Sequence, residues 1–277
     1  MTSRHTARGL VVVGFGAMAS AIVEGALRAG VLDANSVGAA DPSPERRAHA
    51  ESLGCRAFEG AADALAAGPD APVLLAVKPQ SLDAVARDAR APLDDRPVIS
   101  ILAGATIERL ASSLGARRIV RVMPNTPARV GRGVSAVAPG PGATGDDAAF
   151  VRTLFASVGE VVDIPEDLMD AFTAVCGSGP AYVFYLTEAM TRAAREVGFD
   201  DATADRVVRA TVAGAAALLD ADRERSASEL RALVTSKGGT TAAATCVLDD
   251  ARVADALVRA IVAARDRGRE LAGPPRQ

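Results

Sequence analysis

Two glycine-rich segments, far apart in the chain, hold residue types that could bind ligands. The first is Gly14 to Ala19, GFGAMA, which has the GxGxxA spacing of a dinucleotide-binding turn. Gly14 would permit the sharp turn, Gly16 would let a pyrophosphate approach the backbone, and Ala19 would let the helix pack closely on the strand. Free N–H groups of the first helical turn would then face the anion. The spacing predicts a dinucleotide site, because the motif follows a β-branched strand and precedes a helix.

The second segment is Thr235 to Thr241, TSKGGTT, which lies between two predicted helices. Its paired glycines end one helix, and its threonines are expected to cap the next one. Free N–H groups at the new helix start would suit a carboxylate, and the Thr241 hydroxyl can both donate and accept. A plain helix–loop–helix turn would not require these residue types, so we interpret the segment as a substrate loop. The turn Cys176 to Ala181, CGSGPA, either serves packing or lines the same pocket.

Side chains that could supply a proton are scarce. Reduction of a ketone needs a donor for the developing alkoxide, commonly His, Lys or Tyr. The histidines are His5 and His49, and the tyrosines, Tyr182 and Tyr185, suit helix packing better than catalysis. Lys78, at a strand end, could reach a cofactor or simply shape its loop. A protonated cyclic imine needs less help, because hydride addition at carbon leaves a neutral amine, so a carboxylate clamp and a hydroxyl would suffice.

The composition limits the classes of protein that fit. The 277 residues are 49% hydrophobic and 23% charged with a net charge of −3, which is typical of a soluble globular protein. Neither this charge nor the lack of tryptophan favours nucleic acid or an anionic membrane as a partner. Cys55, Cys176 and Cys246 are widely spaced and form no Cys/His cluster, so we predict no metal site. Because no segment resembles a signal peptide or a membrane span, the cytoplasm is the expected location.

Strand and helix patterns alternate through the first 163 residues. Strands are predicted at residues 10–13, 36–40, 55–58, 72–77, 97–101, 119–122, 133–138 and 160–163. These runs lack polar alternation, as in parallel sheets that are buried on both faces. The predicted fold class is α/β, an N-terminal Rossmann domain with a doubly wound, mostly parallel sheet, followed by an all-α dimerisation domain. We expect the Gly- and Pro-containing loops after the strands to meet in one crevice.

Only helical patterns follow, from about residue 164. Helices are predicted at residues 168–175, 181–197, 202–220, 226–235, 240–248 and 252–271. The helices at 202–220 and 252–271 are too apolar for one small bundle to bury, and exposed apolar faces usually mark an interface. We therefore predict two domains, residues 1–163 and 164–277, and a homodimer formed through the second.

The chain resembles the pyrroline-5-carboxylate reductases over nearly its whole length. The resemblance is carried by GFGAMA, AVKPQ at 76–80, VMPNTPA at 122–128, EDLMDAFTAVCGSGPAYV at 166–183 and LRALVTSKGGTTAAATCVLDD at 230–250. It implies reduction of 1-pyrroline-5-carboxylate to L-proline with a nicotinamide dinucleotide, the last step of proline biosynthesis. It also implies a Rossmann domain followed by a helical dimerisation domain, with dimers that can form a ring.

The resemblance further implies which residues form the site. Those implied to contact the cofactor are Gly14, Phe15, Gly16, Ala17, Met18, Ala19, Ala76, Val77, Lys78, Pro79, Ala103 and Glu166. Those implied to bind the substrate are Ser236, Gly239, Thr240 and Thr241. Thr241 would bring its hydroxyl close to the ring nitrogen and is the candidate catalytic residue. The chain departs from the family at Lys237, where many relatives have Pro, and at Asp63, which a loose alignment places where Asn is frequent.

The choice between NADPH and NADH depends on the residues after the second predicted strand. Asp41 stands at the strand end, where a carboxylate favours the free ribose 2′-hydroxyl of NADH. Ser43, Arg46 and Arg47 follow directly and could hold the 2′-phosphate of NADPH. Because the family more often uses NADPH, we expect NADPH and keep NADH as the alternative.

Two other functions remain open alternatives. A β-hydroxyacid dehydrogenase would share the two-domain plan, but that family places a catalytic lysine in the helical domain, and the helix at 181–197 contains none. A non-catalytic dinucleotide-binding protein would not need the TSKGGTT segment. We therefore predict an NAD(P)H-dependent imine reductase whose partner is a small molecule, 1-pyrroline-5-carboxylate.

Overall fold

The computed structural model describes residues 9–88, 93 and 95–272, which form two compact units. One unit contains the residues up to Ser178 together with those from Arg265 onward, and the other is Gly179–Ala264. The division predicted between residues 163 and 164 stays a prediction. His5, one of the proton donors considered above, lies outside the described residues.

The first unit is built on one eight-stranded sheet. The strands are β1 (Leu10–Val13), β2 (Val37–Ala40), β3 (Arg56–Phe58), β4 (Val73–Leu75), β5 (Val98–Ser100), β6 (Ile119–Met123), β7 (Gly133–Pro139) and β8 (Gly159–Asp163). Their order across the sheet is β3-β2-β1-β4-β5-β6-β7-β8, and only β6 and β7 pair antiparallel. The predicted mostly parallel sheet is therefore confirmed, although the sequence did not indicate which strand would reverse.

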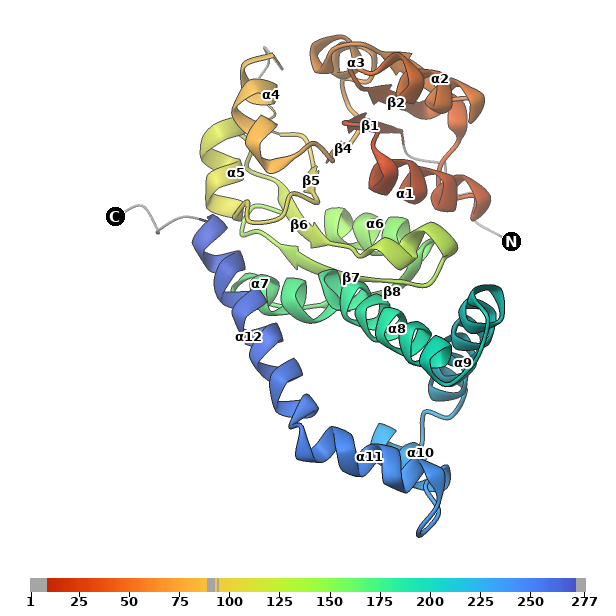
Figure 1. Cartoon of the computed structure of the whole chain (residues 1–277). Coiled ribbons are helices and arrows are strands. Elements are labelled where there is room, and N and C mark those ends of the chain that lie inside the picture. The colour runs from red at the N-terminus through yellow and green to blue at the C-terminus, as the bar shows by residue number, and fades with distance from the viewer. Residues whose placement is uncertain (1–8, 89–92, 94, 273–277) are drawn as a thin grey trace, which may run out of the picture. The chain divides into compact units, whose positions relative to one another are not determined.

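Helices cover both faces of this sheet (Figure 1). The helices of the unit are α1 (Ala17–Arg28), α2 (Pro44–Ser52), α3 (Ala61–Ala67), α4 (Leu82–Asp88), α5 (Ile107–Leu114), α6 (Gly145–Ala156), α7 (Met169–Phe172) and the end of α12 (Val253–Ala272). Leu10 and Val12 of β1 enter one apolar cluster with α1 and α6, whereas Val11 and Val13 enter another with α3, α4 and α5. Because both faces are covered, every residue of β1 is buried, which explains its unbroken apolar run.

The helix predicted at 168–175 is shorter and differently wound than expected. Helix α7 ends at Phe172, a π-helical turn occupies Thr173–Gly177, and α8 begins at Gly179. The Asn125 side chain donates to the carbonyl of Cys176 at 3.1 Å, a hydrogen bond outside the helical ladder. In an α-helix the carbonyl of Cys176 would accept from residue 180, but Pro180 has no N–H, and the Asn125 amide supplies the missing donor.

The second unit consists of helices. They are α8 (Gly179–Glu196), α9 (Asp201–Ala221), α10 (Ala227–Leu233), α11 (Thr240–Asp250) and most of α12 (Val253–Ala272). Helices α8 and α9 pack around a small core of Ala194, Ala204 and Val208. In the part of the chain that the structure describes, no helix has the length and apolar character needed to cross a membrane.

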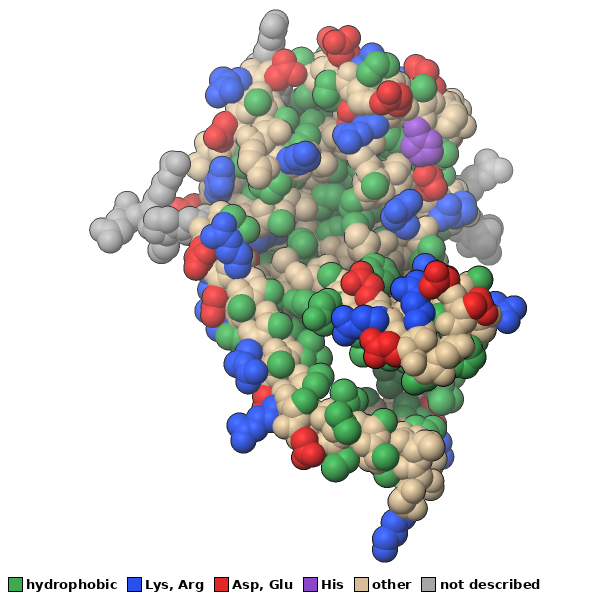
Figure 2. Space-filling view, in the orientation of Figure 1, with side chains coloured by type: hydrophobic (Ala, Val, Ile, Leu, Met, Phe, Trp, Pro, Cys, Tyr) green, Lys and Arg blue, Asp and Glu red, His purple; other side chains and the backbone are tan. Residues whose placement is uncertain are grey.

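Many large apolar side chains of these helices remain exposed. They include Val183, Phe184, Tyr185, Leu186, Leu218, Leu219, Val247, Leu248, Leu257 and Val258. Figure 2 shows hydrophobic side chains at the surface along α11 and α12. Exposed apolar faces of this extent are typical of surfaces that bind another protein chain.

Candidate functional site

The turn between β1 and α1 requires glycine at its first position. Gly14 has a φ of +89°, which side-chain-bearing residues rarely adopt. A Cβ at Gly14 would also lie 2.9 Å from the backbone C and O of Ala76, so the two loops approach closely. Gly16 is the N-cap of α1 and supplies no side-chain cap. The first-turn N–H groups of α1 can therefore serve an anionic ligand.

Asp41, at the end of β2, ties this turn to the next loop. Its carboxyl group is 2% exposed, and Oδ2 accepts a hydrogen bond from the N–H of Phe15 at 2.8 Å. Oδ1 accepts from the N–H of Ser43 at 2.9 Å, and Nη1 of Arg46 lies 3.2 Å from Oδ2. Both carboxylate oxygens thus have partners within the protein, as buried charges require. The Asp41 carboxylate, which was expected to favour NADH, therefore stabilises the loop after β2 and the turn after β1.

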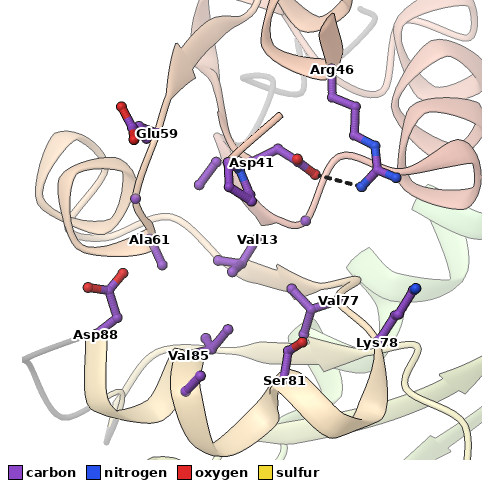
Figure 3. Close-up of a pocket in the computed structure, with 15 residues that line it drawn as sticks. Val13, Asp41, Arg46, Glu59, Ala61, Val77, Lys78, Ser81, Val85 and Asp88 are labelled. Carbon is purple, nitrogen blue, oxygen red and sulfur yellow. Dashed lines mark hydrogen bonds and ion pairs between the residues drawn. The ribbon is translucent and has the colours of Figure 1, made fainter. Parts of the chain in front are cut away.

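A cavity of about 500 Å³ opens beside these loops (Figure 3). It is lined by residues that follow β1, β2, β3 and β4, together with residues of α4. Apolar side chains, among them Val13, Ala61, Val77 and Val85, form much of its wall. A cavity of this size at the carboxyl ends of parallel strands is the usual ligand position in an open α/β sheet.

Apart from Asp41, which pairs with Arg46, the charged side chains that line this cavity are separated by sign. Figure 3 shows Arg46 and Lys78 toward one side and Glu59 and Asp88 toward the other. A Cβ at Gly16 would lie 3.8 Å from Nη1 of Arg46, so this guanidinium group is next to the glycine turn. The basic side could bind phosphate groups, since Arg and Lys both suit them.

The predicted cofactor residues divide into two groups. Gly14, Arg46, Val77 and Lys78 line the cavity. The others lie outside its lining, namely Phe15, Gly16, Ala17, Met18, Ala19, Ser43, Ala76, Pro79, Ala103 and Glu166. Ser43 accepts a hydrogen bond from the N–H of Arg46 at 3.4 Å and so caps α2. The cofactor roles of all these residues stay predictions.

Only some of the loops expected to meet in one crevice line this cavity. The segments after β1, β2 and β4 do, whereas those at 101–104 and 123–127 do not. Asn125 in the second of these accepts from the N–H of Val134 at 2.9 Å and is 8% exposed, which indicates a structural role. Asp63 also lies outside the lining, and Glu59, Gly60 and Ala61 occupy that part of the wall.

Sequence reasoning missed Glu59 and Asp88 as cavity residues. Glu59 directly follows β3, so the rule that ligands lie beyond strand ends could have identified it. Asp88 is the last residue of α4, and no sequence signal marked it. Of the proton donors considered, His49 pairs with Glu24 at 3.1 Å on helices α2 and α1. Tyr185 is 76% exposed in the single chain, so its packing role stays a prediction.

Glu166 and Arg121 form a second feature of this unit. Arg121 of β6 is 5% exposed, and its Nη1 lies 3.2 Å from Oε1 of Glu166. Its Nη2 lies 3.9 Å from Oδ1 of Asp170. Oε1 of Glu166 also accepts a hydrogen bond from the N–H of Ile107 at 2.6 Å. The pair therefore connects the centre of the sheet to the start of α5.

The segment Thr235–Thr241 lies in the second unit, between α10 and α11. Gly238 has a φ of +73°, and the N–H of Gly239 donates to the carbonyl of Ser236 at 3.0 Å. Gly239 is the N-cap of α11 and provides no side-chain cap, so the prediction that threonines cap this helix is wrong. The reason is the tight turn, which already ends at Gly239. Thr240 and Thr241 are the first two residues of α11, where N–H groups are free of helical partners.

Comparison with known proteins gives the family. Residues 166–271 match the model described as pyrroline-5-carboxylate reductase dimerisation, and residues 9–104 match that described as NADP oxidoreductase coenzyme F420-dependent. The pyrroline-5-carboxylate reductase of Pisum sativum is 35% identical over 260 residues, 94% of each chain. That of Methanosarcina acetivorans is 35% identical over 94% of this chain and 96% of its own. The chain belongs to the pyrroline-5-carboxylate reductase family.

Solved structures agree with membership of this reductase family. The pyrroline-5-carboxylate reductase of Coxiella burnetii is 31% identical with a TM-score of 0.88, covering 97% of this chain and 100% of that one. The Plasmodium falciparum pyrroline carboxylate reductase with NADP bound is 26% identical with a TM-score of 0.83, covering 96% and 98%. The predicted family, fold class and oxidoreductase class are confirmed, and the helical region carries the dimerisation domain.

Proposed function

We propose that this chain reduces 1-pyrroline-5-carboxylate to L-proline with NADPH as the hydride donor. The observation that carries the proposal is the 35% identity to a pyrroline-5-carboxylate reductase over 94% of the chain. Both glycine-rich segments lie within the residues that the family models match. Residues 1–163 would bind the cofactor, and residues 164–277 would bind the substrate and form the homodimer. The alternatives, a β-hydroxyacid dehydrogenase and a non-catalytic dinucleotide-binding protein, lack comparable support.

The residues around the β1–α1 turn fit a nicotinamide dinucleotide. A side chain at Gly14 would collide with the backbone of Ala76, and the first turn of α1 offers free N–H groups to a pyrophosphate. Arg46 and Lys78 add positive charge on the same side of the cavity. NADPH, when bound, would supply the hydride for the imine carbon.

A preference for NADPH is supported by the contacts of Asp41. Its oxygens accept from Phe15, Ser43 and Arg46 and the carboxyl group is 2% exposed, so it has little capacity left for a ribose 2′-hydroxyl. The Arg46 guanidinium is about half exposed beside the cavity and could bind a 2′-phosphate, with the Ser43 hydroxyl nearby. The NADP in the Plasmodium falciparum relative points the same way.

The substrate is proposed to bind at Ser236, Gly239, Thr240 and Thr241. The free N–H groups at the start of α11 suit the substrate carboxylate. The Thr241 hydroxyl would accept a hydrogen bond from the protonated ring nitrogen and so help to hold the imine in place. No negative charge develops on that nitrogen in the reaction. The proton on nitrogen stays there, and hydride addition at carbon gives the neutral secondary amine.

One assay tests the proposed function. Oxidation of NADPH and of NADH is followed with 1-pyrroline-5-carboxylate, with 2- and 3-keto acids, and without substrate. We expect turnover of the imine alone, faster with NADPH. Turnover of a keto acid in its place would favour the dehydrogenase, and no turnover of any substrate would favour a binding protein.

The Thr241 role has its own test. Thr241→Ala should lower kcat with the imine by at least about tenfold, since a lost positioning contact has effects of this order. Thr211→Ala is the matched control, because the Thr211 hydroxyl donates to the Val207 carbonyl within α9, outside the proposed substrate loop. Equal rates for the two variants would remove the role assigned to Thr241.

Two further points extend the proposal. We propose that the dimers assemble into a ring, as the family resemblance implies, and light scattering of the purified protein distinguishes a dimer from a larger assembly.

We also propose a cytoplasmic location, which the three unpaired cysteines support because reducing compartments keep thiols free. Fractionation of cells that produce the protein tests this location.

A further inference from the structure

A buried arginine in the sheet connects two segments that are distant in the sequence. Arg121 sits on β6, and the two carboxylates near it, Glu166 and Asp170, follow the end of the last strand. A buried guanidinium group needs such partners, because an unpaired charge in the interior is strongly unfavourable. The ion pair therefore fixes the position of Glu166 against the sheet.

Glu166 also holds the first turn of α5. Its Oε1 accepts from the N–H of Ile107, which is the first residue of that helix. The N-cap residue Thr106 accepts from the N–H of Arg109 at 3.2 Å with its own side chain. One orphan N–H of α5 is thus satisfied locally, and another by a carboxylate 59 residues away. A negative charge at a helix N-terminus is favourable, which strengthens this contact.

These contacts fix both ends of the segment 101–106. At its start, the N–H of Leu102 donates to the Ser100 hydroxyl at 3.3 Å, and Leu102 is 2% exposed. At its end, Ile107 is held by Glu166. Between them Gly104 has a φ of +72° and Ala103 is exposed. The segment is a short turn held at two points, with Ala103 exposed between the buried residues Leu102 and Ala105.

This turn lies at the edge of the sheet where ligands bind. It follows β5, which pairs in parallel with β4, and the residues after β4 line the cavity. Ligands of open α/β sheets bind beyond the carboxyl ends of their parallel strands. The position of the 101–106 turn can therefore influence how the reactive end of a dinucleotide is placed.

We propose that Glu166 is a positioning residue for hydride transfer, which acts through Ile107 to hold the 101–106 turn. Arg121, which also lies 3.9 Å from Asp170, keeps the Glu166 carboxylate in place. This inference rests on the proposed function, because it assigns the turn a part in placing the cofactor for reaction. A misplacement of about 1 Å can cost about a hundredfold in rate without loss of binding.

The experiment compares two substitutions at Glu166 with one control. Glu166→Ala removes the acceptor of the Ile107 N–H, whereas Glu166→Gln keeps an acceptor oxygen and loses only the charge. Asp163→Asn is the control, because Asp163 pairs with Arg152 at 2.9 Å on an exposed part of the same segment. Each variant is measured for kcat, for NADPH binding by the change in NADPH fluorescence, and for the isotope effect with NADPH deuterated at C4.

Glu166→Ala should lower kcat by about tenfold or more while the Kd for NADPH stays within about twofold. Its isotope effect should rise above that of the wild type, because hydride transfer becomes slower than the other steps. Glu166→Gln should recover most of the lost rate, and Asp163→Asn should match the wild type.

Other results would overturn the inference. The first is an unchanged kcat for Glu166→Ala. The second is a loss of rate in Glu166→Ala that equals its loss of folded protein, measured by circular dichroism. The third is a Glu166→Ala variant in which only NADPH binding is weakened. Failure of the proposed function is separate from these results, because it would appear as an inactive wild type. Should Glu166→Ala not fold, Glu166→Asp takes its place, because the shorter side chain withdraws the acceptor from the Ile107 N–H and keeps the charge. It should show the raised isotope effect that Asp163→Asn lacks, and an isotope effect equal to that of the wild type would overturn the inference.

Discussion

At the scale of single residues, the contacts of Asp41 show how a carboxylate can shape a binding loop through hydrogen bonds within the protein. It accepts hydrogen bonds from the backbone of Phe15 and Ser43 and pairs with Arg46. Arg47 donates to the carbonyls of Asp41 and Pro42, and so supports the same loop. We therefore expect the choice between NADPH and NADH to depend more on the exposed Arg46 guanidinium group than on the buried Asp41 carboxylate.

Arg46 gives the residue-scale prediction. Arg46→Ala should raise the KM for NADPH about tenfold and leave the KM for NADH within about twofold, because a charge-assisted hydrogen bond contributes about 1.5–3 kcal/mol. Steady-state kinetics with both cofactors measure the change. Arg28→Ala is the control, since Arg28 pairs with Glu24 in the last turn of α1. Equal losses for NADPH and NADH would contradict a 2′-phosphate contact at Arg46.

At the scale of elements, the start of α6 combines a helix cap with an ion pair. Thr144 and Asp147 form a capping box, and Arg118 binds the Asp147 carboxylate through two nitrogens, at 3.0 and 2.6 Å. Burial by itself raises the pKa of Asp147, but the hydrogen bonds from Arg118 and Thr144 outweigh burial and lower it. The charged form of Asp147 is therefore stabilised in the folded state.

This lowered pKa gives a prediction for the acid dependence of stability. Because the folded-state pKa lies below the unfolded value of about 3.9, the stabilisation is present above that pH and is lost as the pH falls through the folded-state pKa. Asp147→Asn should lower the free energy of unfolding at neutral pH by about 2–3 kcal/mol. Urea unfolding at neutral and acidic pH should show the difference from wild type shrinking in acid.

The control for this prediction is an exposed ion pair of similar chemistry. Asp163→Asn breaks the pair between Asp163, whose side chain is 54% exposed, and Arg152, whose side chain is 42% exposed. This substitution should change the free energy of unfolding by less than about 1 kcal/mol. A difference at Asp147 that stayed constant with pH would show that packing, and not its charge, provides the stabilisation.

Close packing of helix α1 gives a second element-scale prediction. A Cβ at Gly25 would overlap Cγ1 of Val158 and lie 3.0 Å from the Ser157 carbonyl oxygen. Gly25→Ala should therefore lower the unfolding free energy by about 1–3 kcal/mol, although alanine favours helices. Gly145→Ala, which adds a methyl group in open space at the start of α6, should have little effect. Thermal unfolding measures both, and equal stability of the two variants would contradict the close contact.

At the scale of the whole molecule, the exposed apolar faces of the helical region are explained by the dimerisation domain of the family. Phe184→Asp on α8 should shift the protein toward monomers, because it places a charge on a face that the dimer would bury. Light scattering after gel filtration measures the mass. Glu196→Gln on the same helix is the control, and a Phe184→Asp protein that remained fully dimeric would place the interface elsewhere.

The sequence predicted the elements better than their long-range contacts. The run PVLLAV at 72–77 is apolar throughout, so β4 and its burial on both faces could be read from it. The reversal of β7 could not, because pairing direction depends on partners that lie far apart in the chain. The same holds for Asp41 with Phe15 and for Glu166 with Ile107, which join residues 26 and 59 positions apart. The π-helical turn at Thr173–Gly177 was also not predicted, because its residues fit the pattern of a regular helix equally well.

The hydrogen bond between Phe15 and Asp41 has a consequence for the kinetics of cofactor binding. It orders the glycine turn within the fold itself, so no cofactor is needed to bring the turn into shape. Ordering one residue costs about 1–2 kcal/mol, and this cost is met when the protein folds. Association should therefore be a single step without a slow closing phase, and the Phe15 amide should resist hydrogen exchange before any nucleotide arrives.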